Sequence, residues 1–440
     1  MGEPAKHESS YSKQHTTCTM KKVIYILLAT PLLFFMSACE NDDEQFEVLE
    51  QPTQQENPYY VPFETALANV ENLFAQEDLS TRTRHIERTV ESHQEYVANR
   101  GTRSASDSIE VKFHVINFEN NQGFALVSAD SRTTSIYAYS TTGHLDMEYA
   151  IANTGFGDFM EDATEFYKEE IVNGKVIPGD PEPIDTTHVK YKDIPLLPLV
   201  EIDGGYYHIR EGDKEVRYTT GELLSVAWEQ WFPYNYFCEE NLYVDAVYHG
   251  KAAAGCGPIA AAQIMSYYRY PYSAVGTTFD WSLIMTSPSY YKLTTASMET
   301  AHLIKTIGET AHATYGVSTT VTTTNIGSMF KKFGYSISGP ADFDYSKIQS
   351  SLNAFHPVYT RGNSGDVGHA WVIDGYTSYQ HNVTYYYTYP PYDVYKTSTI
   401  YDEVYYHCNW GEGTYTNSWC LSPFKTYNDS KQIIYNIQPQ

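Results

Sequence analysis

Basic residues are scarce in this chain of 440 residues. Lysine and arginine together number 29 against 54 aspartates and glutamates, which gives a formal net charge of -25. Because no basic surplus exists to meet phosphate groups, the composition argues against nucleic acid as a partner. It is typical of a soluble protein that works outside the cytoplasm. The apolar content of 42% is that of a globular protein, and the length is enough for two or more domains.

Metal-binding spacings are also missing. The six cysteines include no Cys-x-x-Cys pair, and the histidines form no cluster. We therefore expect no metal and no cofactor. Cys408 and Cys420 flank a turn and are candidates for a disulfide. If Cys256 must stay free, at most one disulfide can form among these two and Cys238.

The apolar run near the amino end is too short for a comfortable membrane-spanning helix. Val23 to Phe35 follows the basic start Met20-Lys21-Lys22 and precedes Met36-Ser37-Ala38-Cys39. This order predicts a secretory signal within a leader over residues 1–38. Cys39 after Ser-Ala resembles the lipobox of bacterial lipoproteins. We expect an extracytoplasmic protein that touches the outer membrane or cell surface only through a lipid anchor at Cys39. Ordinary secretion with a free Cys39 thiol is the alternative.

The remaining chain divides by composition. Residues 39–57 are acidic and polar, which predicts a flexible tether. Residues 58–172 show helical and strand periodicity, so we expect a small α+β unit, and they hold no cluster suited to chemistry. Residues 173–215 begin rich in proline and glycine, which indicates a linker open to proteolytic cleavage. The unusual motifs gather in residues 216–440.

Cys256 is the candidate nucleophile. It stands in Ala254-Gly255-Cys256-Gly257-Pro258, directly ahead of the apolar segment Ile259 to Tyr270. Proline in a first turn, alanines behind it and a stop at Pro271 predict a buried helix that begins at Cys256. The positive end of a helix dipole lowers the pKa of a thiol and so favours the nucleophilic thiolate. The alternative is a small buried cysteine where a helix packs closely.

His369 is the candidate general base. Pro357-Val358-Tyr359 and His369 to Gly375 have strand character, and Arg361 to Gly368 between them reads as a polar loop. His369 would then begin a strand beside a permissive loop, with Asp374 on the opposite face as a structural residue. The alternative is a hydrogen-bonded structural histidine.

Two further segments offer supporting groups. A Cys–His site needs a third group to hold the imidazole, and Asn409 is the candidate, with Trp410 shielding the pair from water. The alternative is that Asn409-Trp410-Gly411 only forms a turn. Upstream, the side-chain amide of Gln230 is a candidate donor to a developing oxyanion, together with the backbone N–H of Cys256.

These segments, in this order, resemble the streptopain family of papain-like cysteine peptidases. The matching stretches are Trp228 to Asn235, Gly255-Cys256 with Ala262 to Met265, Gly368 to Gly375, and Asn409-Trp410-Gly411. More weakly, Gly123 to Asp130 resembles the inhibitory propeptide of that family. The resemblance implies an α+β fold, with a papain-like peptidase domain over residues 216–440 preceded by an inhibitory prodomain over residues 58–172.

The resemblance also implies roles for single residues. Cys256 is the nucleophile, His369 the general base and acid, and Gln230 the oxyanion donor, while Asn409 and Trp410 compete for orienting the imidazole. The expected product is a zymogen of a cysteine endopeptidase that passes through a thioester acyl-enzyme. Its partners would be protein or peptide substrates and its own prodomain.

Two departures from the family pattern keep other functions open. The family often continues Trp-Gly-Trp-Gly, but here Glu412 stands in place of the second tryptophan. Residues 376–405 form a long tyrosine-rich stretch, which predicts a hairpin insertion over the cleft. The 41 tyrosines of the chain predict packing in the surface layer, or alternatively a binding face. These features favour, as the alternative function, an inactive peptidase-like surface binding or inhibitory protein. Acyl transfer to amines by the same Cys–His pair is a third hypothesis.

Overall fold

A computed structural model describes residues 57, 59–80, 86–98, 109–151, 155–173, 182–183, 200–202, 205–211, 214–244, 249–364, 367–389, 393–422 and 429–440. The predicted leader and signal, the Cys39 anchor and most of the tether lie outside the described residues, as do residues 174–181 and 184–199 of the linker. Glu56–Gln440 is one compact unit. No helix in the described ranges has both the length and the apolar character needed to cross a bilayer.

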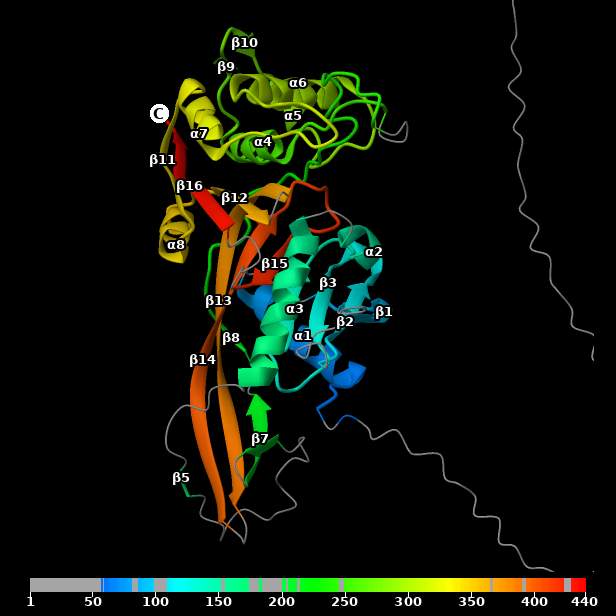
Figure 1. The fold of residues 1–440 in the computed structure, drawn as a ribbon, viewed down its shortest axis with the longest axis vertical. Helices are drawn as coiled ribbons and strands as arrows, with labels where there is room; N and C mark the ends of the chain where they lie inside the picture. Colours follow the sequence, from blue (N-terminus) through cyan, green and yellow to red (C-terminus); the bar gives the residue numbers. More distant parts are fainter. Residues whose placement is uncertain are drawn as a thin grey trace, which may run out of the picture. The chain divides into compact units, whose positions relative to one another are not determined.

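The prodomain is an antiparallel sheet with helices, as its mixed periodicity predicts. Its strands are β1 (Val90–Val97), β2 (Lys112–Phe118), β3 (Phe124–Ser128) and β4 (Ile136–Ser140), and they pair in that order. Its helices are α1 (Phe63–Ser80), α2 (Met147–Ala150) and α3 (Gly155–Asn173), with a short 3-10 turn, η2 (Glu119–Asn121), between β2 and β3. Helix α3 runs along the sheet (Figure 1).

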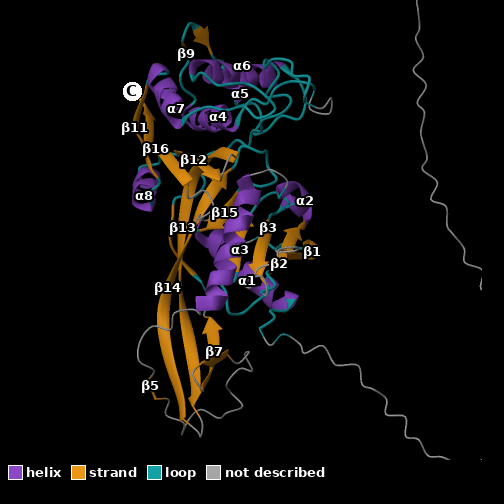
Figure 2. Ribbon diagram, in the orientation of Figure 1, coloured by secondary structure: helices purple, strands orange, loops and turns teal. Residues whose placement is uncertain are grey.

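The helices of the peptidase domain gather at one end of its sheet (Figure 2). They are α4 (Cys256–Tyr268), α5 (Trp281–Ile284), α6 (Thr295–Thr310) and α7 (Thr323–Lys332), beside the two-stranded pair β9 (Ser273–Ala274) and β10 (Thr277–Thr278). Helix α8 (Tyr345–Asn353) packs near β13, β12 and β16. The predicted helix start at Cys256 is confirmed. Its end at Arg269 takes a left-handed conformation just ahead of Pro271, as a helix stop requires.

One antiparallel sheet runs through both domains. Its order is β1-β2-β3-β4-β15-β14-β13-β12-β16-β11. The peptidase strands are β11 (Tyr335–Asp342), β12 (Val358–Ser364), β13 (Val367–Tyr389), β14 (Asp393–Asn409), β15 (Ser418–Leu421) and β16 (Asp429–Pro439). The prodomain joins through β4, where Tyr139 pairs with Trp419 and Ala138 with Cys420.

The predicted polar loop at residues 361–368 is wrong for most of its length. Strand β12 continues to Ser364 and β13 begins at Val367, so Gly362 pairs with His369 and Asn363 with Gly368. The antiparallel pairing of β12 with β13 satisfies these backbone groups by ladder hydrogen bonds, which the polar side chains alone do not reveal. His369 therefore lies within a paired strand.

The tyrosine-rich stretch is a hairpin, as predicted, but it does not lie over the start of α4. Strands β13 and β14 pair from Val372 with Asn409 to Tyr389 with Asp393. Figure 1 shows their distal parts running away from α4. The predicted linker contains β5 (Glu182–Pro183), β6 (Val200–Ile202) and β7 (Gly205–Glu211), and β8 (Glu215–Thr219) begins at its end; β6 pairs with β7. β7 and β8 pair with β13, and β5 pairs with β14.

Buried tyrosines join the prodomain to the peptidase domain. One continuous core contains side chains of both, and the other core surrounds α4. Contrary to the prediction of surface-layer packing, many tyrosines are fully buried: Tyr137, Tyr139, Tyr167, Tyr234, Tyr335, Tyr359, Tyr379 and Tyr405. Several of their hydroxyls have polar partners, whereas the Tyr359 hydroxyl makes no hydrogen bond to a described residue. Tyr139 Oη donates to Glu77 Oε1 at 2.7 Å, and Tyr379 also donates to that carboxylate across the domain boundary.

Candidate active site

Cys256 is the first residue of α4. Gly255 precedes it at φ 95°, and a side chain there would meet Thr319 Cγ2 at 2.7 Å, so only glycine fits this approach to the helix. Burial raises the pKa of the Cys256 thiol. The backbone N–H groups of Ala370 and Gly257 and the charge of Arg361 act in the opposite direction. The helix start and the strand that carries His369 thus meet at this sulfur.

His369 is hydrogen-bonded to a group other than Cys256 in this structure. Its Nε2–H donates to the backbone carbonyl of Trp410 at 2.9 Å, and the side chain is only 7% exposed. Burial lowers the imidazole pKa to about 4, against the effect of the Trp410 carbonyl. Among the described residues, no hydrogen bond or ion pair joins His369 to Cys256. The imidazole is therefore neutral and engaged on its Nε2 side.

The start of α3 in the prodomain sits against this histidine. A Cβ built on Gly155 would lie 2.7 Å from His369 Cδ2 and 2.5 Å from Trp410 Cε3, so only a glycine backbone fits. The Gly155 N–H donates to Glu412 Oε1 at 2.9 Å. Glu412 Oε1 is also 3.9 Å from His369 Nε2. The Glu412 carboxyl group thus contacts the prodomain at Gly155 and lies close to the imidazole of His369.

Sequence reasoning missed Gly155 and saw Glu412 only as a departure from a pattern. The available signal at Gly155 was a pair of glycines, Gly155 and Gly157, at the beginning of a helix, where helix propensity argues against them. Burial, with the nearby charge of Asp158, raises the pKa of Glu412 to about 8. The carboxyl is therefore mostly protonated at neutral pH in this arrangement.

Asn409 and Trp410 have separate partners here. The Asn409 amide donates to the Val226 carbonyl at 2.7 Å, and its Oδ1 accepts from Gly411 N at 3.2 Å. It is the backbone carbonyl of Trp410, with no contribution from the Asn409 side chain, that holds His369. The Trp410 ring lies 6.4 Å from the His369 ring, beside Trp371. The catalytic roles expected for Asn409 and Trp410 stay predictions.

Gln230 lies next to the segment that leads into Cys256. Its carbonyl accepts a hydrogen bond from Ala254 N at 2.8 Å. The Gln230 side chain is partly exposed and makes no hydrogen bond to another described residue. Its amide is thus available to a ligand, which is what the oxyanion prediction needs.

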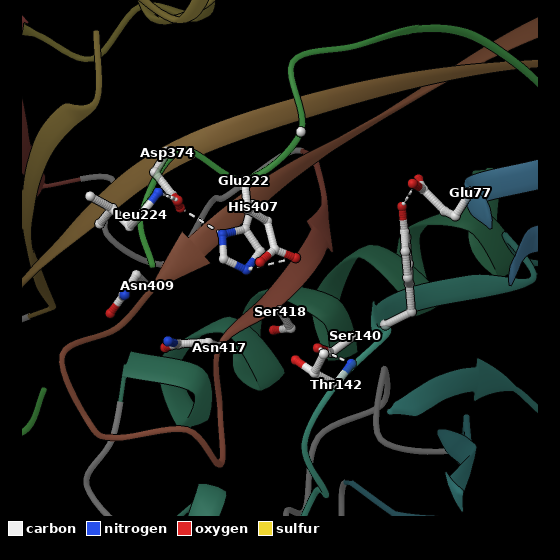
Figure 3. Close-up of polar contacts among 12 residues, drawn as sticks. Glu77, Ser140, Thr142, Glu222, Leu224, Asp374, His407, Asn409, Asn417 and Ser418 are labelled. Atoms are coloured by element: carbon white, nitrogen blue, oxygen red, sulfur yellow. Dashed lines mark hydrogen bonds and ion pairs between the residues drawn. The ribbon is translucent and has the colours of Figure 1, made fainter. Parts of the chain in front are cut away.

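A second buried polar cluster lies deeper in the sheet. His407 on β14 donates from Nδ1 to Asp374 Oδ1 at 2.6 Å, and its Nε2 is 3.7 Å from Glu222 Oε1 (Figure 3). Asp374 Oδ2 also accepts from Leu224 N at 2.8 Å. The two carboxylates raise the pKa of His407 to about 9 against the effect of burial. The cluster therefore ties the segment after β8 to the strands that carry His369 and Asn409. This agrees with a structural role for Asp374.

The candidate disulfide between Cys408 and Cys420 is not formed. Cys408 and Cys420 lie on neighbouring strands, both buried and both free, as is Cys238. The described residues contain no group of three or more His, Cys, Asp and Glu side chains placed to hold a metal ion.

Comparison with known proteins agrees with this geometry. Residues 228–420 match the model of the Peptidase C10 family, and residues 42–166 match that of the Spi protease inhibitor. Streptopain of Streptococcus pyogenes is 27% identical over 290 residues, which cover 58% of this chain and 65% of that protein. The peptidase region of the chain, less than half of its length, is thus similar to the streptopain family.

A second protein and a solved structure are also similar to this chain. The thiol protease/hemagglutinin PrtT of Porphyromonas gingivalis is 26% identical over 310 residues, which are 62% of this chain and 32% of that protein. The solved prointerpain A fragment of Prevotella intermedia has 15% identity and a TM-score of 0.46, over 79% of this chain and 98% of that fragment. The chain matches about two thirds of streptopain's length, at 65%. The Peptidase C10 match lies within the predicted peptidase region, and the inhibitor match overlaps the predicted prodomain.

Proposed function

We propose that this chain is the zymogen of a secreted or lipid-anchored cysteine endopeptidase, with Cys256 and His369 as its catalytic dyad. The observation that carries the proposal is the start of α3 against His369, with Gly155 bonded to Glu412. A peptidase that must stay inactive until it is processed needs a contact that restrains its general base. The Cys39 anchor belongs to the same proposal and rests on the signal sequence.

The proposed reaction begins when the prodomain leaves. His369 then turns its free Nδ1 toward Cys256 and takes the thiol proton, and the thiolate attacks the carbonyl carbon of the substrate. The Gln230 amide and the Cys256 N–H stabilise the oxyanion. His369 returns the proton to the leaving amine, which gives a thioester. Water, deprotonated by His369, attacks the thioester and releases the acid and the thiol.

The test is reductant-dependent processing of the purified precursor. We expect incubation with a thiol reductant to produce cleavage between about residues 173 and 220, read by intact mass, because the composition of this segment indicates accessibility. Strand β8 and the Leu224–Asp374 bond belong to the peptidase sheet, which favours a cut ahead of Glu215. A precursor that stays intact with reductant, and whose Cys256 resists a thiol-directed epoxide, would contradict the proposal.

The second candidate is an inactive binding or inhibitory protein on the same scaffold. The observation that favours it is that His369 is hydrogen-bonded to the Trp410 carbonyl and makes no hydrogen bond to Cys256, together with the raised thiol pKa. It predicts no thiolate titration below pH 7 at Cys256 after the prodomain is removed. The zymogen proposal predicts that a thiolate appears below pH 7 on removal.

Gly155→Ala is expected to weaken the latency of the precursor. The added methyl group would overlap Trp410 and His369, and overpacking of this kind costs about 1–3 kcal/mol. The undocked fraction should rise about tenfold for each 1.4 kcal/mol. The initial rate at which the epoxide labels Cys256 in the uncut precursor measures this fraction.

Glu165→Ala is the matched control, because Glu165 is exposed on the same helix and its salt bridge to Lys168 is a surface pair. It should label at the rate of the unchanged chain. Equal labelling rates for Gly155→Ala and the unchanged chain would show that this contact does not restrain the site.

A further inference from the structure

Glu412 carries a buried oxygen with no partner. The side chain is 7% exposed, and while Oε1 accepts from Gly155 N, Oε2 makes no hydrogen bond to any described residue. A buried carboxyl group with one unsatisfied oxygen costs free energy, and such a group in a native structure points to a role in another state. The direction in which Oε1 faces indicates that role.

The carboxyl faces the nitrogen of His369 that does not serve Cys256. Oε1 is 3.9 Å from Nε2, the same nitrogen whose proton is bonded to the Trp410 carbonyl. Two oxygen acceptors therefore converge on one N–H, and Nδ1 is left for the thiol. A carbonyl and a carboxylate placed in this way orient an imidazole, and the carboxylate also favours its positively charged form.

In the precursor this carboxyl group is kept without charge. Burial under α3 and the neighbouring Asp158, whose own pKa is raised to about 7, favour the protonated form of Glu412. Removal of the prodomain takes away the cover, the Asp158 charge and the Gly155 N–H together. The carboxyl then ionises near its ordinary pKa, beside an imidazole that has been freed from Gly155.

We propose that Glu412 is a positioning residue of the mature peptidase, whose carboxylate pairs with Nε2 of His369 and stabilises the imidazolium. This inference rests on the proposed function and deepens it. Glu412 would thus supply an electrostatic partner to the histidine that the Asn409 amide, bonded to Val226, does not supply.

Other charged groups near Glu412 and His369 also act on the pKa values of this site. Oε1 of Glu412 lies 3.9 Å from His369 Nε2 on β13, and the charge of Asp158 on α3 raises the pKa of Glu412. The charge of Glu412 in turn raises the pKa of the Cys256 thiol on α4, which Arg361 lowers. Glu229 is also near, since its Oε2 would lie 3.9 Å from a Cβ on Gly413. The closest charged partner is His369, so the main effect of Glu412 falls on the imidazolium.

The test compares the processed peptidase with its Glu412→Gln variant. In a plot of kcat/KM against pH, the fall in activity on the alkaline side (the alkaline limb) reports loss of the imidazolium proton of His369. Without the Glu412 carboxylate, the midpoint of that limb should shift to lower pH by about one unit. Activity at pH values above the midpoint should then fall about tenfold, and activity near pH 6 should change little. Alkylation of Cys256 by iodoacetamide should show the same shift. Glu412→Asp keeps the charge and should keep most of the limb.

Glu240→Gln is the matched control, since it removes one carboxylate from an exposed site and should leave both limbs in place. Coincident alkaline limbs for Glu412→Gln and the unchanged enzyme would overturn the proposal. If the variant fails to fold, the unchanged enzyme can be measured directly. With Cys256 capped by methyl methanethiosulfonate, the imidazole of His369 should titrate above pH 6.5 by NMR. Titration below pH 6.5 would overturn the proposal. Failure of the proposed function would look different from failure of this inference. In that case the unchanged enzyme would show neither peptide turnover nor labelling of Cys256.

Discussion

Cys256→Ala is expected to abolish peptide hydrolysis by the processed protein and to leave the precursor uncut in reductant. Alanine keeps the helix start but removes the only atom able to form the thioester. Loss of a nucleophile in a comparable acyl-transfer site costs on the order of 10⁵- to 10⁶-fold in kcat. The measurement is turnover of a fluorogenic peptide, with epoxide labelling followed by mass.

The control for this experiment is Cys238→Ala. Cys238 is a free thiol buried in the core around α4, and burial raises its pKa to about 12, so it is a poor nucleophile. Its replacement should lower stability without abolishing turnover. Retained hydrolysis in Cys256→Ala would remove the basis for the proposed dyad, even if the precursor still folded.

Asp374→Asn is expected to destabilise the folded chain by about 3–5 kcal/mol at pH 7, because it leaves His407 buried with its closest negative partner removed. The asparagine side chain keeps an oxygen that can accept the hydrogen bond from Leu224 N, so the variant tests the loss of the negative charge. The free energy of unfolding, from denaturant titration, measures the loss.

The pH dependence of that loss follows from His407. Its pKa is raised to about 9 in the folded chain, above the ordinary value of 6.5. The stabilisation is therefore complete below pH 6.5 and is lost as the pH rises through 9. The gap between Asp374→Asn and the unchanged chain should narrow at pH 10. A gap of the same size at pH 7 and pH 10 would contradict the charged pair, and Asp342→Asn, at an exposed site on β11, serves as control.

The elements that carry Cys256 and His369 could be predicted because their signals are local. Pro258, the alanines and Pro271 define α4, and the apolar alternation after His369 defines a strand. The order of the motifs was enough to predict the resemblance to the streptopain family, which the family-model match to residues 228–420 supports. The contact between Gly155 and Glu412 has no local signal, since it joins residues 257 positions apart and exists only when the domains pack together.

Backbone partners were also beyond sequence reasoning. A search for a side chain to orient His369 favoured Asn409, whereas a main-chain carbonyl holds the imidazole here, and any residue type supplies that group. The burial of the tyrosines was missed for a related reason. A phenol is amphipathic, and whether it lies at the surface depends on a partner such as Glu77, which comes from a distant helix.

The join between the two domains has a consequence for how long latency lasts. The prodomain is held to the peptidase by the short β4–β15 ladder, the shared aromatic core and the Gly155–Glu412 bond, none of which is covalent. A cut between residues 173 and 214 therefore turns an intramolecular restraint into a complex of two chains. Its occupancy then follows mass action. In a concentrated sample the nicked protein would remain silent, and simple dilution below the dissociation constant would switch it on without any further cleavage.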